Sequence, residues 1–328
     1  MLAMHAPDGF LEPSVAAITA VVSLTVVALS IRAAGRELGD RQVPLAGLTA
    51  AFVFAAQMFN FPVASGTSGH LLGGALAAIL LGPWVGCLVT SVVVVVQALL
   101  FADGGLTALG YNVLNMAIVP AFGGWALYWA FRKLLPANSS GVVGATALAS
   151  GGSVVLSAMA FSIEWLFGAS APVPFDTVFV AMVGVHALIG IGEAVISSLI
   201  VAAVLASRPD LVAGARDLTA EQLTDRPKVA ARTFVIGGVL TTVVIAVVIS
   251  QFASSNPDGL ERVATDTGFA ESGRDHDLDG SIFADYATRG IDNESLSLAV
   301  AGLTGVALTL LVGYGIVTAS RHTRLSRS

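Results

Sequence analysis

Charged residues are scarce in this chain of 328 amino acids. Only 12% of the residues are charged, whereas 55% are hydrophobic, and the mean hydropathy is +0.83. Soluble domains contain about 25% charged residues, so the composition excludes an ordinary soluble protein. The apolar runs consist mainly of Val, Ala, Leu and Gly, without the alternating polarity of membrane strands. The sequence therefore predicts an all-α integral membrane protein.

Cysteine and lysine are almost absent as well. The single cysteine, Cys87, excludes an internal disulfide and a cysteine-rich metal cage. The two lysines, Lys133 and Lys228, follow Arg132 and Pro227, so neither belongs to the Gly-Lys-Ser/Thr end of a phosphate-binding loop. The sequence therefore predicts no nucleotide-binding phosphate loop in this chain, so that any uphill process would need a motor from a partner.

The apolar residues form nine predicted helical segments. A membrane-spanning helix needs roughly 20 mainly apolar residues. The dipeptide Gly82-Pro83 breaks one long run, so the short piece before it counts as a separate helix. The nine segments are Ser14–Ile31, Leu45–Phe61, His70–Leu81, Trp84–Phe101, Tyr111–Phe131, Val142–Phe167, Asp176–Leu205, Thr233–Phe252 and Ser295–Ala319.

Basic residues predict the orientation of these segments. They gather at 32–41 after the first segment, at 132–133 after the fifth, at 208–232 between the seventh and eighth, and at 321–327. With nine spans all four clusters lie on one side, which the positive-inside rule makes the cytoplasm. The N-terminus is then outside, and His5 and His70 share the outer face.

These two histidines lie in turn-forming, glycine-containing sequence. His5 belongs to the stretch MHAPDG at residues 4–9, and His70 ends the stretch GTSGH at 66–70. Imidazoles combined with backbone or terminal nitrogen favour Ni(II), Cu(II) or Co(II). Magnesium and calcium prefer oxygen ligands, and only Asp8 offers a carboxylate nearby. The pattern therefore indicates a nitrogen-rich site for a late transition metal.

Other polar residues near the two histidines either orient the imidazoles or form turns. They are Asp8, Asn60, Ser65, Thr67 and Ser68. His186 and Glu193 lie seven residues apart on one face of the seventh segment. We expect them outside the metal site, because that segment runs inward from an external start near Asp176.

For the residues away from this group of polar side chains, we expect simpler roles. Glu164, near the outer end of the sixth segment, is expected at the membrane interface. The acidic stretch Ser254–Glu294, which contains His276, predicts a solvated external loop that weakly concentrates cations. Cys87 is expected to be a small core residue.

Several motifs together resemble one family. They are MHAPDGFL at 4–11, RQVP at 41–44, AAQM at 55–58, NFP at 60–62, GTSGHLLGG at 66–74 and GVHALIG at 184–190. Residues 4 to about 212 resemble the CbiM/NikM family, the substrate-capturing component of energy-coupling factor transporters for cobalt and nickel. The tail, with NPDGLE at 256–261 and FADY at 283–286, resembles the small PDGLE-type companion subunit NikN.

The resemblance implies an organisation and a set of partners. Residues 1–212 would form the capture domain, 213–232 a cytoplasmic linker, and 233–328 a fused NikN-like unit with two membrane helices. Expected partners are a transmembrane coupling subunit and two cytoplasmic ATPases in the cell membrane, with no nucleic acid. The fused tail favours nickel over cobalt as transported ion, and no permanently bound cofactor is expected.

The resemblance also implies a square-planar site of four nitrogens. Carried over to this chain, they are the terminal amine of Met4, the amide and imidazole of His5, and the imidazole of His70. The sequence departs from the family pattern because Met1-Leu2-Ala3 precede the Met-His pair. We expect translation to start at Met4; if it starts at Met1, the fourth ligand must differ.

Two other functions are compatible with parts of the sequence. The GTSG stretch at 66–69 matches the Gly-x-Ser-Gly motif of rhomboid intramembrane proteases, with Ser68 as nucleophile and His186 as base. That serine would have to lie below the membrane surface, however, and a four-residue pattern is weak without its structural context. A passive channel or secondary metal transporter is the third possibility.

Overall fold

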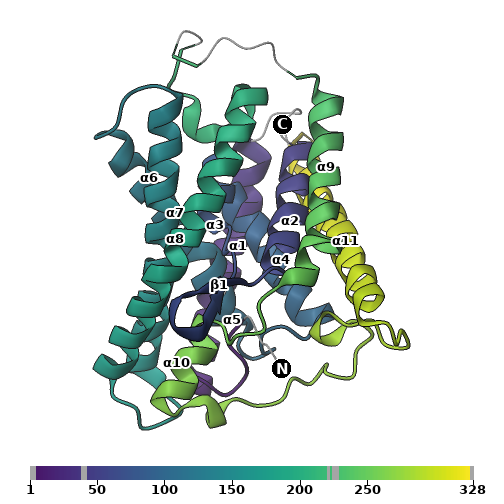
Figure 1. Ribbon diagram of the computed structural model, residues 1–328. Helices are drawn as coiled ribbons and strands as arrows, with labels where there is room; N and C mark the ends of the chain where they lie inside the picture. Colours follow the sequence, from purple (N-terminus) through teal and green to yellow (C-terminus); the bar gives the residue numbers. More distant parts are fainter. Residues whose placement is uncertain (1–4, 38–42, 220–221, 224–228, 326–328) are drawn as a thin grey trace.

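The computed structural model describes residues 5–37, 43–219, 222–223 and 229–325 as a bundle of helices with one small β-hairpin (Figure 1). The hairpin joins β1 to β2 in antiparallel register, with Phe61 opposite Gly69. Helices and strands have these bounds: α1 Pro13–Glu37, α2 Val43–Gln57, β1 Phe61–Val63, β2 Thr67–Gly69, α3 Gly74–Leu81, α4 Pro83–Leu100, α5 Leu109–Val113, α6 Gly124–Arg132, α7 Ser139–Gly168, α8 Phe175–Ser207, α9 Ala231–Val247, α10 Gly259–Thr267 and α11 Glu294–Leu325.

All nine predicted segments are helical in the described part of the chain. Seven helices are long and apolar enough to cross a membrane, counting Leu109–Arg132 as one and extending α9 to Phe252. The other two, α2 with 15 residues and α3 with 8, are shorter. The all-helical membrane class is confirmed, whereas nine complete crossings and an external N-terminus stay predictions.

The third segment begins later than predicted. Residues 67–69 pair as β2, and the chain then runs without regular structure from His70 until α3 starts at Gly74. Gly73 makes the turn into α3 with φ +76°, a conformation that glycine adopts without strain. The helix ends at Gly82, with φ +94°, and Pro83 opens α4 as its first residue. His70 therefore lies in an irregular entrance to a short helix, not inside it.

The helix from Leu109 to Arg132 is irregular at its centre. Residues Leu114–Gly123 form wide π-type turns around Pro120, which has no backbone N–H to donate. Pro120 packs close to Gly74, so the irregular stretch is fitted against the start of α3. Asn112 lies just before this stretch and Asn115 within it, and both line the cavity described below.

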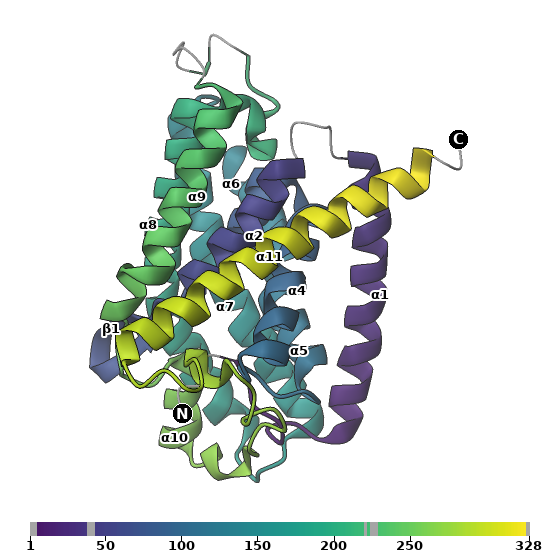
Figure 2. The same cartoon turned by 90° about the vertical axis from the view of Figure 1, so that its right-hand side faces the viewer.

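The C-terminal helices pack on the earlier bundle. Helix α11 crosses α2 diagonally and α9 runs beside α2, as the turned view shows (Figure 2). Gly305 allows this crossing, because a Cβ atom there would overlap the Phe54 ring. Helix α1 lies at the edge of the bundle and exposes Ile18, Val21 and Leu24, as expected for a lipid-facing surface.

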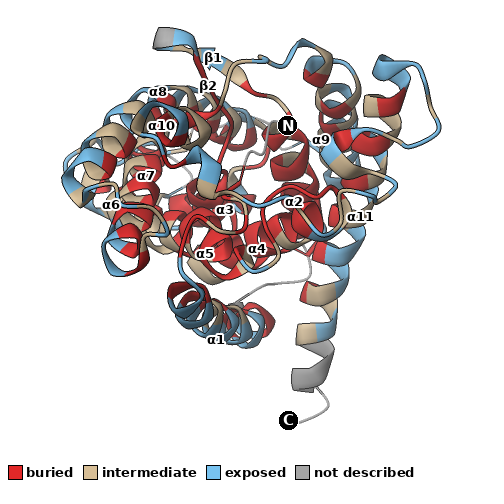
Figure 3. Cartoon of the chain, turned by 90° about the horizontal axis from the view of Figure 1, so that it is seen from below, coloured by how far each residue is buried: buried red, intermediate tan, exposed pale blue. Residues whose placement is uncertain are grey.

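The acidic loop is folded over one end of the bundle, while most of its acidic side chains are exposed, as expected of a solvated loop. Helix α10 lies against α8 and beside β2 (Figure 3). Phe269 is buried and packs on Trp165, with ring centroids 4.4 Å apart, and on Phe10 at 5.1 Å. Buried contacts of this kind hold the loop against the bundle despite its negative charge. The composition of the loop alone did not reveal these contacts.

Candidate metal site

Hydrogen bonds hold the N-terminal segment around His5 inside the bundle, at the end that carries the hairpin and α10. Asn112 accepts from Ala6 N at 3.1 Å and donates to Ala6 O at 2.9 Å. The carboxylate of Asp8 accepts from the backbone N–H groups of Leu106, Thr107 and Ala108 at 2.7–3.1 Å. These bonds draw the N-terminal segment inward, and His5 is only 2% exposed.

His70 is fixed through the backbone that follows it. Glu193, fully buried in α8, accepts from Leu72 N at 2.7 Å and from Gly73 N at 3.0 Å. Gln57 of α2 donates to Leu72 O at 2.9 Å. The loop between β2 and α3 is thus held from two helices, and His70 itself is 7% exposed.

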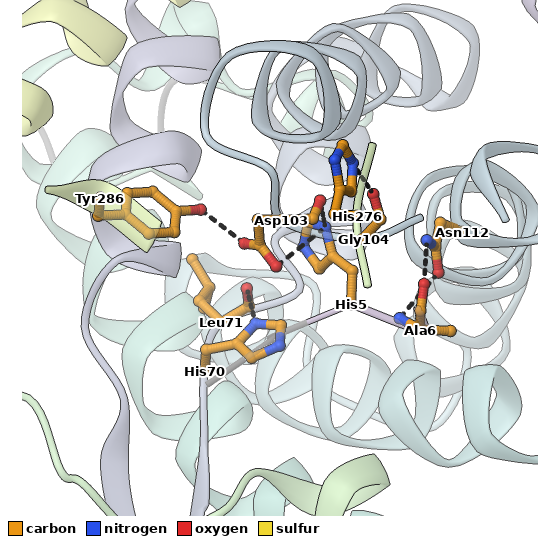
Figure 4. A network of polar contacts seen from close by, with 9 residues as sticks. All are labelled: His5, Ala6, His70, Leu71, Asp103, Gly104, Asn112, His276 and Tyr286. Carbon is orange, nitrogen blue, oxygen red and sulfur yellow. Dashed lines mark hydrogen bonds and ion pairs between the residues drawn. The ribbon is translucent and has the colours of Figure 1, made fainter. Parts of the chain in front are cut away.

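His5 and His70 face one another across a cavity of about 80 Å³ (Figure 4). Their ring centroids are 6.0 Å apart and the ring planes are inclined by 61°. Imidazole nitrogen binds late transition metals at about 2.0–2.1 Å, so two centroids sharing one ion lie at most roughly 6 Å apart. The two rings are therefore close enough to bind the same ion.

Hydrogen bonds indicate where the proton lies in each ring. His5 Nδ1 lies 3.2 Å from Asp103 O, and His70 Nδ1 lies 3.2 Å from Leu71 O. A carbonyl oxygen only accepts, so in both rings Nδ1 carries the proton and Nε2 carries the lone pair. Nε2 of His5 is buried and has no hydrogen-bond partner among the described residues. A buried acceptor without a partner is uncommon.

The other residues predicted to support the site hold loops rather than imidazoles. Asp8 anchors the N-terminal segment as described above. Asn60 O accepts from Ser254 N at 2.8 Å, and Thr67 is buried in β2. Ser68 donates to Asn256 O at 2.7 Å, not to a histidine. Met4 and the side chain of Ser65 lie outside the described residues.

His186 and Glu193 correct the expectation that placed them away from the histidines. His186 lines the same cavity as His5 and His70, and Glu193 holds the loop after His70. His186 is ten residues along α8 from Asp176, or about 15 Å at 1.5 Å per residue. The cavity is recessed into the bundle by about this depth, whereas the sequence argument put the histidines at the surface.

Two further residues make contacts that were not expected. Glu164 is 8% exposed and accepts from Asn115 Nδ2 at 2.7 Å. His276 is half-buried, and its Nε2 donates to Gly104 O at 3.1 Å. Cys87 is a buried core residue as expected.

Asp103 and Asn112 are contacts that sequence reasoning missed. Asp103 is 3% exposed and contacts the His5 ring, and Asn112 holds the backbone of Ala6. A signal for Asp103 was its position in an Asp-Gly-Gly turn directly after an apolar segment. Asn112, an amide within an apolar segment, was a similar signal.

The PDGLE motif at residues 257–261 covers the cavity. Ser68 N donates to Pro257 O at 2.8 Å, which joins the motif to β2. Leu260 lines the cavity, and a Cβ atom on Gly259 would lie 2.6 Å from Ile189 and 3.0 Å from the His186 ring. The start of α10 therefore fits closely over the residues around His70 and His186.

Asp258 caps α10 from a buried position. Its carboxylate accepts from Glu261 N at 2.8 Å. Burial raises the pKa of Asp258 to about 8, and the negative charges of Glu261 and Asp103 act in the same direction. The covering motif thus contains a carboxyl group that holds its proton near neutral pH.

The chemistry of the cavity suits a small cation with nitrogen ligands. It offers imidazoles and the amide groups of Asn112 and Asn115. Among the described residues no three His, Cys, Asp or Glu side chains form a group that could hold a metal ion. A metal bound between His5 and His70 would therefore need further ligands from the backbone or from the preceding residues.

Known proteins resemble the chain over most of its length. The model of the CbiM cobalt uptake substrate-specific transmembrane region matches residues 5–211, and the PDGLE domain model matches residues 232–322. A candidate fused nickel transport protein NikMN of Archaeoglobus fulgidus is 34% identical over 321 residues, 97% of this chain and 99% of that relative. A candidate metal transport protein of Haloquadratum walsbyi is 42% identical over 209 residues, 64% of this chain and 93% of that relative.

A solved structure shares the fold of the helical bundle. The crystal structure of a truncated transition metal transporter matches with a TM-score of 0.54 at 31% sequence identity, covering 61% of this chain and 98% of that one. Fold and cavity thus define a multi-pass membrane component of metal transport. The chain belongs to the CbiM family and has a PDGLE domain fused at its C-terminal side, which confirms the resemblance seen in its motifs.

Proposed function

We propose that this chain captures Ni(II) or Co(II) outside the membrane for an energy-coupling factor importer, with nickel as the favoured ion. The observation that carries the proposal is the pair of imidazoles of His5 and His70, whose ring centroids lie 6.0 Å apart at one buried cavity. The full-length similarity to a candidate fused nickel transport protein supports nickel. Planar nitrogen coordination, which Ni(II) accepts readily, points the same way.

In this proposal His5 contributes its amide nitrogen and its imidazole, which share one ion through Nδ1, and His70 contributes its imidazole. The ion would then replace the contact of His5 Nδ1 with Asp103 O. The amine of Met4 completes the set where it is free. Deprotonated amide and amine nitrogens are strong donors, so no third side-chain ligand is needed. Supporting this arrangement, the bonds of Asp8 and Asn112 hold the backbone around His5 close to His70.

The energy would come from partners. The chain has no Gly-Lys-Ser/Thr sequence for ATP binding, and the family resemblance implies a coupling subunit and two ATPases. Nucleotide-dependent uptake in vesicles that contain all subunits supports this assignment. Uptake that persists without nucleotide would favour a passive or secondary transporter instead.

The binding test uses the purified full-length protein and Ni(II) alone. We expect one ion per chain, and His5→Ala and His70→Ala should each weaken binding by more than about 100-fold, beyond the effect of losing a supporting hydrogen bond. His186→Ala is the matched control, because its ring lines the same cavity while Nδ1 is bonded to Met182 O at 2.8 Å. An equal loss in the control would contradict the ligand set.

A further inference from the structure

A groove of about 660 Å³ runs along the bundle between α1 and the helices α4, α5 and α11. Helix α1 lies at the edge of the bundle, and α11 crosses toward its C-terminal end (Figure 2). The groove is lined by small and apolar residues, and its three hydroxyl groups are bonded inside the protein. Ser23 donates to Gly110 O, Ser91 to Cys87 O and Thr107 to Asp8 Oδ1, at 2.6–2.7 Å. The groove therefore presents an apolar surface.

The groove is long and narrow. Its α1 residues extend from Pro13 to Ile31, which is about 27 Å at 1.5 Å per residue. Over this length the volume corresponds to a mean cross-section of about 24 Å², too little for a helix of 10–12 Å diameter to enter. An extended hydrocarbon chain is thin enough. One leaflet of the bilayer core is about 15 Å deep, so a chain that begins beside Pro13 would end near Ser23 and Leu24.

Arg274 lies at one end of this groove, together with Gly9 and Leu11. Its backbone N–H donates to Asp8 O at 2.8 Å. Its side chain runs over Gly9, where an added Cβ atom would be 3.1 Å from Arg274 Cγ. Gly9 has φ +93°, so both the backbone and this close approach favour glycine. The arginine is thus held at the mouth of the groove, where it is exposed.

The guanidinium of Arg274 makes no ion pair within the part of the chain that the structure describes. This is unexpected, because residues 254–294 include ten acidic residues, and Arg262 of the same segment pairs with Asp266 at 2.7 Å. The carboxylate of Asp8 already accepts from three backbone N–H groups. A free guanidinium above an apolar groove is complementary to a phosphate group that carries hydrocarbon chains.

We propose that the groove binds a phospholipid, with its phosphate on Arg274 and one hydrocarbon chain along α1 as far as Leu24. A guanidinium can donate two parallel hydrogen bonds to phosphate oxygens. The chain would cover the apolar surface at Ala17 and Ala20. Two membrane spans begin beside Arg274, at Pro13 and Leu109, which places the guanidinium at the level of the head groups. This binding is independent of the metal site, so it holds or fails separately from the proposed function.

The first experiment tests the phosphate contact in the full-length protein in neutral detergent. Phosphatidylglycerol is the probe, diacylglycerol with the same chains is the reference without phosphate, and native mass spectrometry counts the bound lipid. We expect phosphatidylglycerol to bind about tenfold more tightly. Arg274→Gln should abolish this preference and Arg274→Lys should keep part of it. Arg289→Gln is the matched control, because Arg289 is an exposed arginine of the same segment that lines a different cavity.

The second experiment fills the groove. Ala17 lines it and is exposed, so Ala17→Leu occupies the space of the chain without entering the packed core. Phosphatidylglycerol should bind about fourfold more weakly for each methylene group that the leucine displaces. Ile18→Leu is the control, because Ile18 is 64% exposed on the neighbouring surface of α1 and is not among the residues lining the groove. It should bind lipid as the unmodified protein does.

Three results would overturn the lipid site. One is equal binding of phosphatidylglycerol and diacylglycerol to the unmodified protein. Another is a loss in Arg289→Gln as large as that in Arg274→Gln, which would indicate general attraction to the surface. The third is a dimer of the chain that disappears in Ala17→Leu while lipid binding stays unchanged, which would show that a second copy covers the groove.

Discussion

Replacing Glu193 by alanine removes both acceptors from the loop that carries His70. The backbone N–H groups of Leu72 and Gly73 now donate to the Glu193 carboxylate at 2.7 and 3.0 Å, in a fully buried position. A buried donor that loses its partner costs about 1–3 kcal/mol. Two such donors lower the free energy of unfolding by roughly 2–6 kcal/mol, since neither backbone group can turn toward another acceptor.

Glu164→Ala is the control for this change. Glu164 is also buried in a long helix, but it accepts from one side chain, Asn115 Nδ2, which can rotate to a new partner. We expect it to lower the free energy of unfolding in detergent, measured by chemical denaturation, by less than Glu193→Ala does. Ni(II) affinity should fall about 10–100-fold for Glu193→Ala, because the loop at His70 loosens. Equal destabilisation by the two variants would refute the reasoning.

Two other predictions concern α10 and α11. Burial raises the pKa of Asp258 to about 8, from about 3.9 in an unfolded chain. The stabilisation by its proton is complete below pH 4 and is lost as the pH rises to 8. Protection of the α10 amides from hydrogen exchange, corrected for intrinsic rates, should therefore fall between about pH 4 and 8 in the unmodified protein. In Asp258→Asn, which keeps a neutral cap, it should stay level. Equal profiles for the two proteins would contradict this prediction. Gly305→Val should lower the free energy of unfolding by about 1–3 kcal/mol or more, because the added side chain overlaps Phe54. Gly315→Val, with open space around it, should not; similar free energies of unfolding for the two variants would count against the packing argument.

The helices were predictable because their signal is local. Apolar runs of sufficient length, broken by Gly82 and Pro83, gave the nine helical segments, and the short third helix was recognised from that break. The hairpin before it was not, since strands of three residues carry almost no periodic pattern. The folded acidic loop was missed because its anchors, such as Phe269, are isolated apolar residues in a polar stretch.

The proximity of His5 and His70 was predictable from the sequence, whereas the residues that surround them were not. His5 and His70 stood out because imidazoles are few in this chain and both lie in glycine-rich turns. The contacts of Asp103 and Glu193 join residues 98 and 121 positions apart. Nothing in a single sequence indicates which of its many polar residues will meet at such separations. The depth of the cavity, and with it the place of His186, follows from the tertiary arrangement.

Helix α10 is tied to the membrane on both sides, by residues 248–258 to α9 and by residues 268–293 to α11. A segment tethered in this way meets its own cavity at an effective concentration in the millimolar range, whatever the abundance of any other protein. Each molecule therefore carries its own cover in a fixed ratio of one to one. Such a design needs no matched expression of a separate subunit, and every chain that reaches the membrane arrives with the cover already in place.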